Sequence, residues 1–190
     1  LSISFIVAAP LNTRSHQLYK RFRDFLLRYE SPRRIADEQS IESGEASVLI
    51  FGMGRVGAGA YDSLERRLPG RVLGVDQDHV VAEEHLEAGR RVLCSSATDP
   101  DFWLRFTMDN QKISMIMLAM PNLQENILAA QQIRETGYSG RISAIAKYQD
   151  EIEPLREAGI DSVFNLYEEA GTGFAEEVVE YLPMEATGHV

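Results

Sequence analysis

The chain has 190 residues, 44% of them hydrophobic, and a formal net charge of −10. This length and composition suffice for one globular domain with an appended segment. The acidic balance argues against a nucleic-acid-binding surface on the main domain. The single cysteine, Cys94, excludes an intramolecular disulfide framework and fits a reducing compartment.

The N-terminal part differs in charge from the rest. Residues 1–34 hold seven Lys and Arg against two Asp and Glu, whereas residues 35–190 hold the other twelve basic residues and 27 acidic ones. Residues 1–11 are almost wholly apolar but too short to cross a bilayer, which needs about 20 residues. We expect the end of a membrane helix here, or alternatively a buried strand or core helix segment. Since the sequence starts at Leu1, without an initiator methionine, we expect it to be part of a longer protein.

A basic amphipathic helix is predicted over residues 14–30. Its apolar positions at helical spacing are Leu18, Phe22, Phe25, Leu26 and Tyr29. A basic cluster after an apolar segment is typical of the cytoplasmic side of a membrane span; alternatively, the helix packs on the domain or on a second copy. Residues 31–46 are polar and show no periodicity, which predicts a linker. The expected organisation is thus membrane end, basic helix and linker in 1–46, and a folded domain in 47–190.

From Ser47 onward, short apolar runs alternate with helical patterns. Strands are predicted at 47–51, 71–75, 91–94, 113–118, 141–146 and 161–164, and helices near 55–68, 78–89, 99–106, 122–137, 148–158 and 167–182. Six βα units predict an α/β fold with a Rossmann-like, doubly wound parallel sheet. Its ligand crevice would lie beyond the carboxyl ends of the strands, at the turns 52–57, 76–78, 95–99 and 119–122.

The first of these turns reads Gly52-Met53-Gly54-Arg55-Val56-Gly57. In a dinucleotide-binding turn the first glycine lets the chain reverse, the second lets the backbone approach a phosphate, and the third lets helix and strand pack closely. Amides at the start of the helix would hold the anion. Asp76, which lies 19 residues past Gly57 at the end of the next strand, can accept both hydroxyls of a ribose. Together these features indicate nucleotide binding, although a tight strand-helix turn without a ligand would also use glycines.

The other turns suit an adenosine. Residues 95–99 supply small side chains and hydroxyls near the expected adenine edge, although Thr98 or Asp99 could instead cap the following helix. Arg55 could neutralise a phosphate or simply be solvated. The candidate nucleotide-binding residues are Gly52, Met53, Gly54, Arg55, Val56, Gly57, Asp76, Gln77, Ser96, Ala97, Thr98, Asp99 and Met120.

Catalytic chemistry is not indicated. The residues beyond the sixth strand are too few for the substrate domain of a dehydrogenase. His16, His79, His85 and His189 share no metal-ligand spacing, and we expect His79 and His85 to be surface residues of one helix. Cys94, in a predicted buried strand, is expected to be a structural thiol. There is no GxxxxGK[ST] motif, which argues against ATP hydrolysis of the P-loop kind.

Four segments carry a family resemblance: VLIFGMGRVG, LGVDQD, CSSATDPDFW and EIEPLREAGIDSVFN. Over residues 46–182 the chain resembles the TrkA-N (KTN, or RCK) regulatory domain of bacterial potassium transport systems. It looks most like the cytoplasmic C-terminal part of Kef-type glutathione-regulated potassium-efflux antiporters. Two departures stand out: Ser95-Ser96 replaces the family's Gly-Asp, and Ala146-Lys147 stands where glutathione-responsive members tend to carry arginine.

The resemblance implies a non-catalytic domain at the cytoplasmic face of the bacterial inner membrane. Such a domain forms a homodimer, binds AMP or NAD(H), responds in some members to glutathione or a glutathione adduct, and controls the membrane antiporter or channel part of its own chain. The amphipathic patterns at 122–137 and 167–182, with Leu18, Phe22 and Phe25, are candidate dimer surfaces. Two alternatives stay open: a small NAD(P)-dependent oxidoreductase, and a structural adaptor that binds no nucleotide.

Overall fold

The computed structural model describes Ile41 and residues 43–106, 112–179 and 181. Its strands are β1 (Val48–Phe51), β2 (Val72–Asp76), β3 (Val92–Cys94), β4 (Met115–Leu118), β5 (Arg141–Ala146) and β6 (Ser162–Asn165). The first and last residues of each strand lie within two positions of the predicted bounds. β1 and the first four residues of β2 are fully buried, which explains their unbroken apolar sequence.

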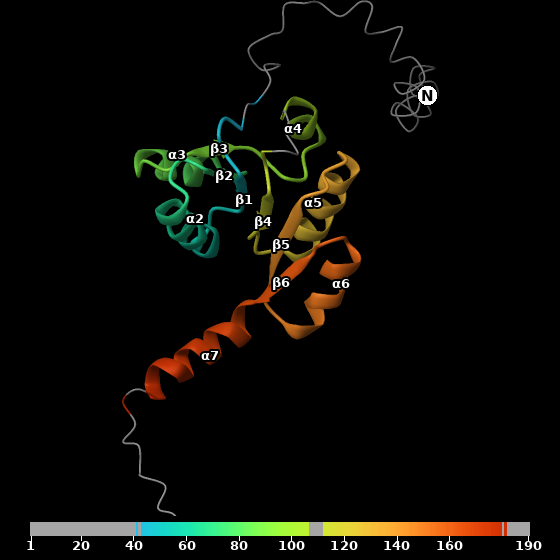
Figure 1. The fold of residues 1–190 in the computed structure, drawn as a ribbon. Coiled ribbons are helices and arrows are strands. Elements are labelled where there is room, and N and C mark those ends of the chain that lie inside the picture. Colours follow the sequence, from blue (N-terminus) through green and yellow to red (C-terminus); the bar gives the residue numbers. More distant parts are fainter. Residues whose placement is uncertain (1–40, 42, 107–111, 180, 182–190) are drawn as a thin grey trace, which may run out of the picture. The chain divides into compact units, whose positions relative to one another are not determined.

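The strands form one sheet in the order β3-β2-β1-β4-β5-β6, and every neighbouring pair is parallel. The predicted Rossmann-like doubly wound sheet is therefore confirmed. The strand order reverses at β1, between β2 and β4, so the switch point lies next to the glycine turn (Figure 1).

Helices follow the strands in alternation. They are α2 (Arg55–Arg67), α3 (His79–Glu87), α4 (Pro100–Arg105), α5 (Leu123–Glu135), the 3-10 helix η3 (Gln149–Glu151), α6 (Ile152–Glu157) and α7 (Leu166–Val179). In Figure 1, α2 and α3 cover one face of the sheet, and α5 and α6 cover the other. Because βαβ connections are in general right-handed, the helices change to the opposite face of the sheet where the strand order reverses.

Each face of the sheet has its own hydrophobic core. On the α5 side, alternate strand residues such as Phe51 and Ile116 pack against Ile133 and the aromatic cluster of α4. On the α2 side, Ile50 belongs to a smaller core with Tyr61 of α2. The core on the α5 side is the larger of the two. It includes Phe51, the last residue of β1, and therefore extends to the carboxyl end of that strand.

α7 does not pack on the sheet, although its amphipathic pattern allowed that prediction. It leads away from β6 (Figure 1), and none of its residues is buried. Phe174 is 71% exposed, and Val178 and Val179 are exposed as well. By contrast, α5 buries its apolar face, including Ala129 and Ile133, against the sheet. Of the two predicted helical dimer surfaces, α7 therefore keeps its apolar side free among the described residues.

Several predictions concern segments outside the described residues: the apolar start, the basic helix at 14–30 and the linker up to Ser40. Within the described part of the chain, no helix combines the length and hydropathy required to span a bilayer.

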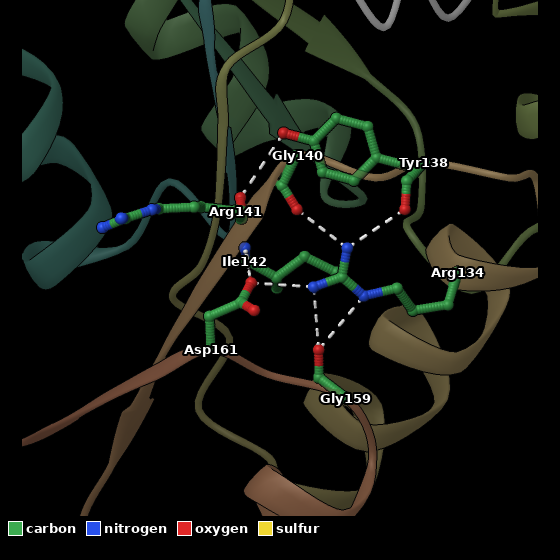
Figure 2. Close-up of polar contacts among 7 residues, drawn as sticks. All are labelled: Arg134, Tyr138, Gly140, Arg141, Ile142, Gly159 and Asp161. Atoms are coloured by element: carbon green, nitrogen blue, oxygen red, sulfur yellow. Dashed lines mark hydrogen bonds and ion pairs between the residues drawn. The ribbon is translucent and has the colours of Figure 1, made fainter.

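One arginine ties together the loops at the amino end of β5 and β6 (Figure 2). The Arg134 guanidinium on α5 donates to the carbonyls of Tyr138, Gly140 and Gly159 at 2.8–3.1 Å and pairs with the Asp161 carboxylate at 2.7 Å. All five donors are therefore used on one side chain. Because three of the acceptors are main-chain carbonyls, this residue stabilises the loops themselves.

We expect Arg134→Met to lower the free energy of unfolding by about 2 kcal/mol, because several carbonyls and a carboxylate lose a charged donor at once. Arg156→Met is the matched control: its exposed ion pair with Glu153, at 3.7 Å, is worth less than about 0.5 kcal/mol. Urea unfolding of both variants measures the difference. Equal losses for the two variants would contradict the assignment.

Candidate functional site

A cavity of about 290 Å³ opens at the carboxyl ends of the strands. It is lined by Phe51, Gly52, Val75, Asp76, Gln77, Ser95, Ser96, Ala97, Met120, Pro121, Asn122 and Glu125. Apart from Glu125, in the first turn of α5, these residues come from the ends of β1 to β4 and the turns after them, as expected for the switch point of a doubly wound sheet.

At two positions of the first turn, neighbouring main-chain atoms lie so close that only glycine fits. Gly52 has a φ of +87°, and a Cβ there would lie 2.9 Å from the backbone of Ala119 at the end of β4. A Cβ on Gly57 would overlap the carbonyl oxygen of Gly52. The turn therefore reverses sharply and brings α2 against β1, the two functions that the sequence predicted for these glycines.

The start of α2 is left without a side-chain cap or an acidic residue. Gly54 is its N-cap and provides no side-chain cap, and the first turn contains no acidic residue. The first backbone N–H groups of a helix lack intrahelical acceptors and carry its positive partial charge. A Cβ on Gly54 would meet nothing within 4 Å, so the backbone faces open space there. Arg55, the first residue of α2, is exposed.

Asp76 is fixed at the end of β2 by two main-chain donors. Met53 N–H donates to Oδ2 at 2.6 Å and Asp78 N–H donates to Oδ1 at 2.9 Å. Each carboxylate oxygen has a further lone pair. The half-buried carboxylate can therefore orient the glycine turn and still accept hydroxyls from a ligand in the cavity.

Side chains of α4 and α5 hold the loop after β3 by hydrogen bonds to its main-chain carbonyls. Trp103 Nε1–H donates to the carbonyl of Ala97 at 2.7 Å, and Gln132 Nε2–H donates to that of Thr98 at 3.2 Å. On the other side, Asn126 donates to the carbonyl of Met120 at 3.0 Å. Both rims of the cavity are thus anchored.

The TrkA-N domain family matches residues 48–166, well over half of the chain. The chain belongs to the TrkA-N domain family. No curated protein matches its sequence.

Solved structures similar to this TrkA-N domain share its fold. The NAD(P)-binding domain of an exopolyphosphatase-related protein from Archaeoglobus fulgidus aligns with a TM-score of 0.63 at 18% identity, covering 71% of this chain and 98% of that one. The TrkA-N domain of the inner membrane protein YbaL from Escherichia coli gives 0.58 at 22%, with 72% and 96% covered. The GsuK channel bound to NAD gives 0.53 at 23%; 82% of this chain aligns with 26% of that protein.

In this TrkA-N domain the structure gathers only part of the predicted site around the cavity. Of the candidate residues, those lining it are Gly52, Asp76, Gln77, Ser96, Ala97 and Met120. Arg55, Val56 and Gly57 belong to α2, the first turn of which follows Gly54. Met53 buries its side chain against Gly74 and contributes its peptide groups to the turn.

Thr98 and Asp99 do not line the cavity. The Asp99 carboxylate accepts from Asp101 N–H at 3.0 Å and caps α4, which confirms the capping alternative. Thr98 forms a hydroxyl contact with Ser96 at 3.0 Å and so supports the loop. Sequence reasoning missed Phe51, Val75 and Glu125 as cavity residues; Glu125 lies in the first turn of α5, directly after a predicted crevice turn.

Two further expectations were wrong. Cys94 is exposed, because β3 is an edge strand and pairs only with β2 among the described strands. His85 is not a free surface residue: it is half-buried, and its Nε2 lies 2.6 Å from the carbonyl oxygen of Met53. His79 is exposed, as predicted. No cluster of three metal-ligating side chains occurs in the described ranges.

Proposed function

We propose that this TrkA-N domain is a non-catalytic regulatory module that binds an adenine nucleotide, AMP or NAD(H). The observation that supports this most is that Asp76, a fixed carboxylate in the cavity lining, holds through Met53 N–H the same turn that leads to the helix start at Gly54, which has no side-chain cap. The helix start suits a phosphate and the carboxylate suits ribose hydroxyls.

We propose that the domain forms the cytoplasmic part of a membrane protein for potassium efflux or cation–proton antiport, and that it controls the activity of this protein. Family membership supports a role in potassium transport, and the resemblance to Kef-type antiporters supports efflux. The nucleotide would act by population shift: it stabilises one dimer arrangement by binding it more tightly than the other. A differential affinity of a few kcal/mol suffices.

The proposed function is tested first by asking what the purified protein binds. The denatured protein's supernatant is analysed by mass spectrometry, and AMP, NADH, NADPH and glutathione are titrated into nucleotide-free protein by calorimetry. We expect saturable binding of AMP or NADH without oxidation of the nicotinamide. Turnover of NADH or NADPH with an added carbonyl compound would instead favour the oxidoreductase alternative, and absence of any binding would favour the structural adaptor.

The homodimer in this proposal uses α7. Its exposed side chains include Tyr167, Phe174 and Val178, and Phe164 at the end of β6 adds a fourth exposed apolar group. Exposed apolar side chains on one helix are typical of an interaction surface. A second copy of the same helix offers matching apolar groups, which is the arrangement of a two-fold interface.

We expect Phe174→Asp to weaken self-association by about 2 kcal/mol, or roughly 30-fold, because a charge replaces an apolar anchor at the interface. Leu104→Asp is the matched control, since Leu104 is 82% exposed on α4, away from α7 in the sequence. Sedimentation velocity over a wide concentration range, with and without AMP, measures both variants. A wild-type chain that stays monomeric throughout, or equal effects of the two substitutions, would contradict the α7 interface.

A further inference from the structure

A chain of polar contacts lies behind the glycine turn and connects three segments. His85 of α3 contacts the Met53 carbonyl oxygen through Nε2 at 2.6 Å, and its Nδ1 lies 3.1 Å from an Arg90 terminal nitrogen. Arg90, in the loop after α3, also donates to both carboxylate oxygens of Asp62 on α2, each at 2.8 Å. The turn is thereby linked to α2 and α3.

The partners of His85 select its tautomer. A carbonyl oxygen only accepts, so Nε2 carries the hydrogen; a guanidinium only donates, so Nδ1 is the acceptor. The two contacts are satisfied together by the tautomer that carries its hydrogen on Nε2. Arg90 is held in place by Asp62 in a two-pronged ion pair, and its hydrogen bonds lower the pKa of the Asp62 carboxyl.

This tautomer fixes the peptide between Met53 and Gly54. Both ends of Met53 are held, since its N–H donates to Asp76 at 2.6 Å and its carbonyl accepts from His85. In a planar trans peptide the C=O and the following N–H point in opposite directions, and the described chain has no cis peptide bonds. With the Met53 carbonyl directed at α3, the Gly54 N–H points away from α3.

The Gly54 N–H is the donor that a phosphate would use. Gly54 is the N-cap of α2, its surroundings are open, and its N–H donates to no residue in the described ranges. We propose that His85 is a positioning residue for phosphate binding: by holding the Met53 carbonyl, it presents the Gly54 N–H to the nucleotide phosphate. This inference rests on the proposed nucleotide function.

Without the His85 contact, the Met53–Gly54 peptide can rotate, and the Gly54 N–H is no longer preorganised. The loss concerns the phosphate and leaves the Asp76 carboxylate and the loop from Ser95 to Ala97 intact. Adenosine, which lacks the phosphate, should then be insensitive to position 85. A residue that merely stabilised the fold would affect adenosine and AMP alike.

The test compares the affinities of AMP and adenosine for the 190-residue chain and its variants, by calorimetry for AMP and by NMR titration for adenosine. For His85→Leu we expect AMP affinity to fall by about tenfold, the value of one hydrogen bond, with adenosine affinity unchanged within about twofold. His85→Gln, which keeps an N–H donor and an acceptor, should recover most of the AMP affinity. His79→Leu, on the exposed side of the same helix, is the control and should change neither.

Each outcome decides the matter. Unchanged AMP affinity in both His85 variants, or parallel losses for AMP and adenosine, would overturn the positioning role while leaving the proposed function in place. Should His85→Leu fail to fold, His85→Gln and Arg90→Met are judged by the same ratio of AMP to adenosine affinity. A wild-type chain that binds neither ligand would overturn the proposed function, and the positioning role with it.

Discussion

Replacing Asp76 by alanine is expected to weaken AMP and NADH binding by about 100-fold. A hydrogen bond to a charged group contributes about 1.5–3 kcal/mol, and a ribose offers two hydroxyls to this carboxylate. The structure adds a second cause, because the Asp76 carboxylate also accepts from Met53 N–H at 2.6 Å. The substitution therefore removes the ribose acceptor and one of the two groups that hold the glycine turn.

The same contacts determine what an asparagine would do. Both carboxylate oxygens of Asp76 accept main-chain N–H groups, so the amide of Asp76→Asn must direct its own N–H₂ toward one of those donors. We expect a loss close to that of alanine, even though one acceptor oxygen survives. Asp78→Ala is the control, since its side chain caps α3 through Val80 N–H and does not line the cavity. Calorimetry with AMP that ranks Asp78→Ala beside Asp76→Ala would remove Asp76 from the ribose site.

The strands and the crevice could be predicted from the sequence because they depend on local patterns. A fully buried parallel strand such as β1 has to read as a continuous apolar run, and the glycines after it have to allow the chain to turn. The acid at the end of β2 follows from the same pattern. Local signals also gave the capping role of Asp99, since a short acidic side chain before Pro100 favours a helix start.

What could not be predicted depends on residues that meet only in the folded chain. His85 and Met53 are 32 positions apart, and Arg90 and Asp62 are 28 apart, so no spacing rule connects them. The exposure of Cys94 follows from the strand order, which puts β3 at an edge, and not from its apolar neighbours. Similarly, the patterns of α5 and α7 are both amphipathic, but only tertiary packing decided that α5 covers the sheet.

Valine substitutions at Gly54 and Gly57 should separate binding from folding within one turn. Gly54 has ordinary backbone angles, φ −66° and ψ −164°, and open space where a Cβ would stand. We expect Gly54→Val to fold normally but to lose about 100-fold or more in AMP affinity, because the side chain would occupy the phosphate position and displace its charge-assisted N–H contacts.

Gly57→Val should act in the opposite way, because its Cβ would overlap the Gly52 carbonyl oxygen at the closest approach of α2 to β1. Main-chain atoms cannot move aside as a flexible side chain can, so we expect a loss of about 3 kcal/mol in the free energy of unfolding, the upper part of the range for overpacked sites. Urea unfolding and AMP calorimetry are applied to both variants. We expect Gly54→Val to lose AMP affinity at unchanged stability, and Gly57→Val to lose stability. A Gly54 variant that still binds AMP would show that the turn is only structural. A Gly57 variant as stable as the wild type would show that α2 does not need this close approach, and the geometry that presents the start of α2 to a phosphate would have to be reconsidered.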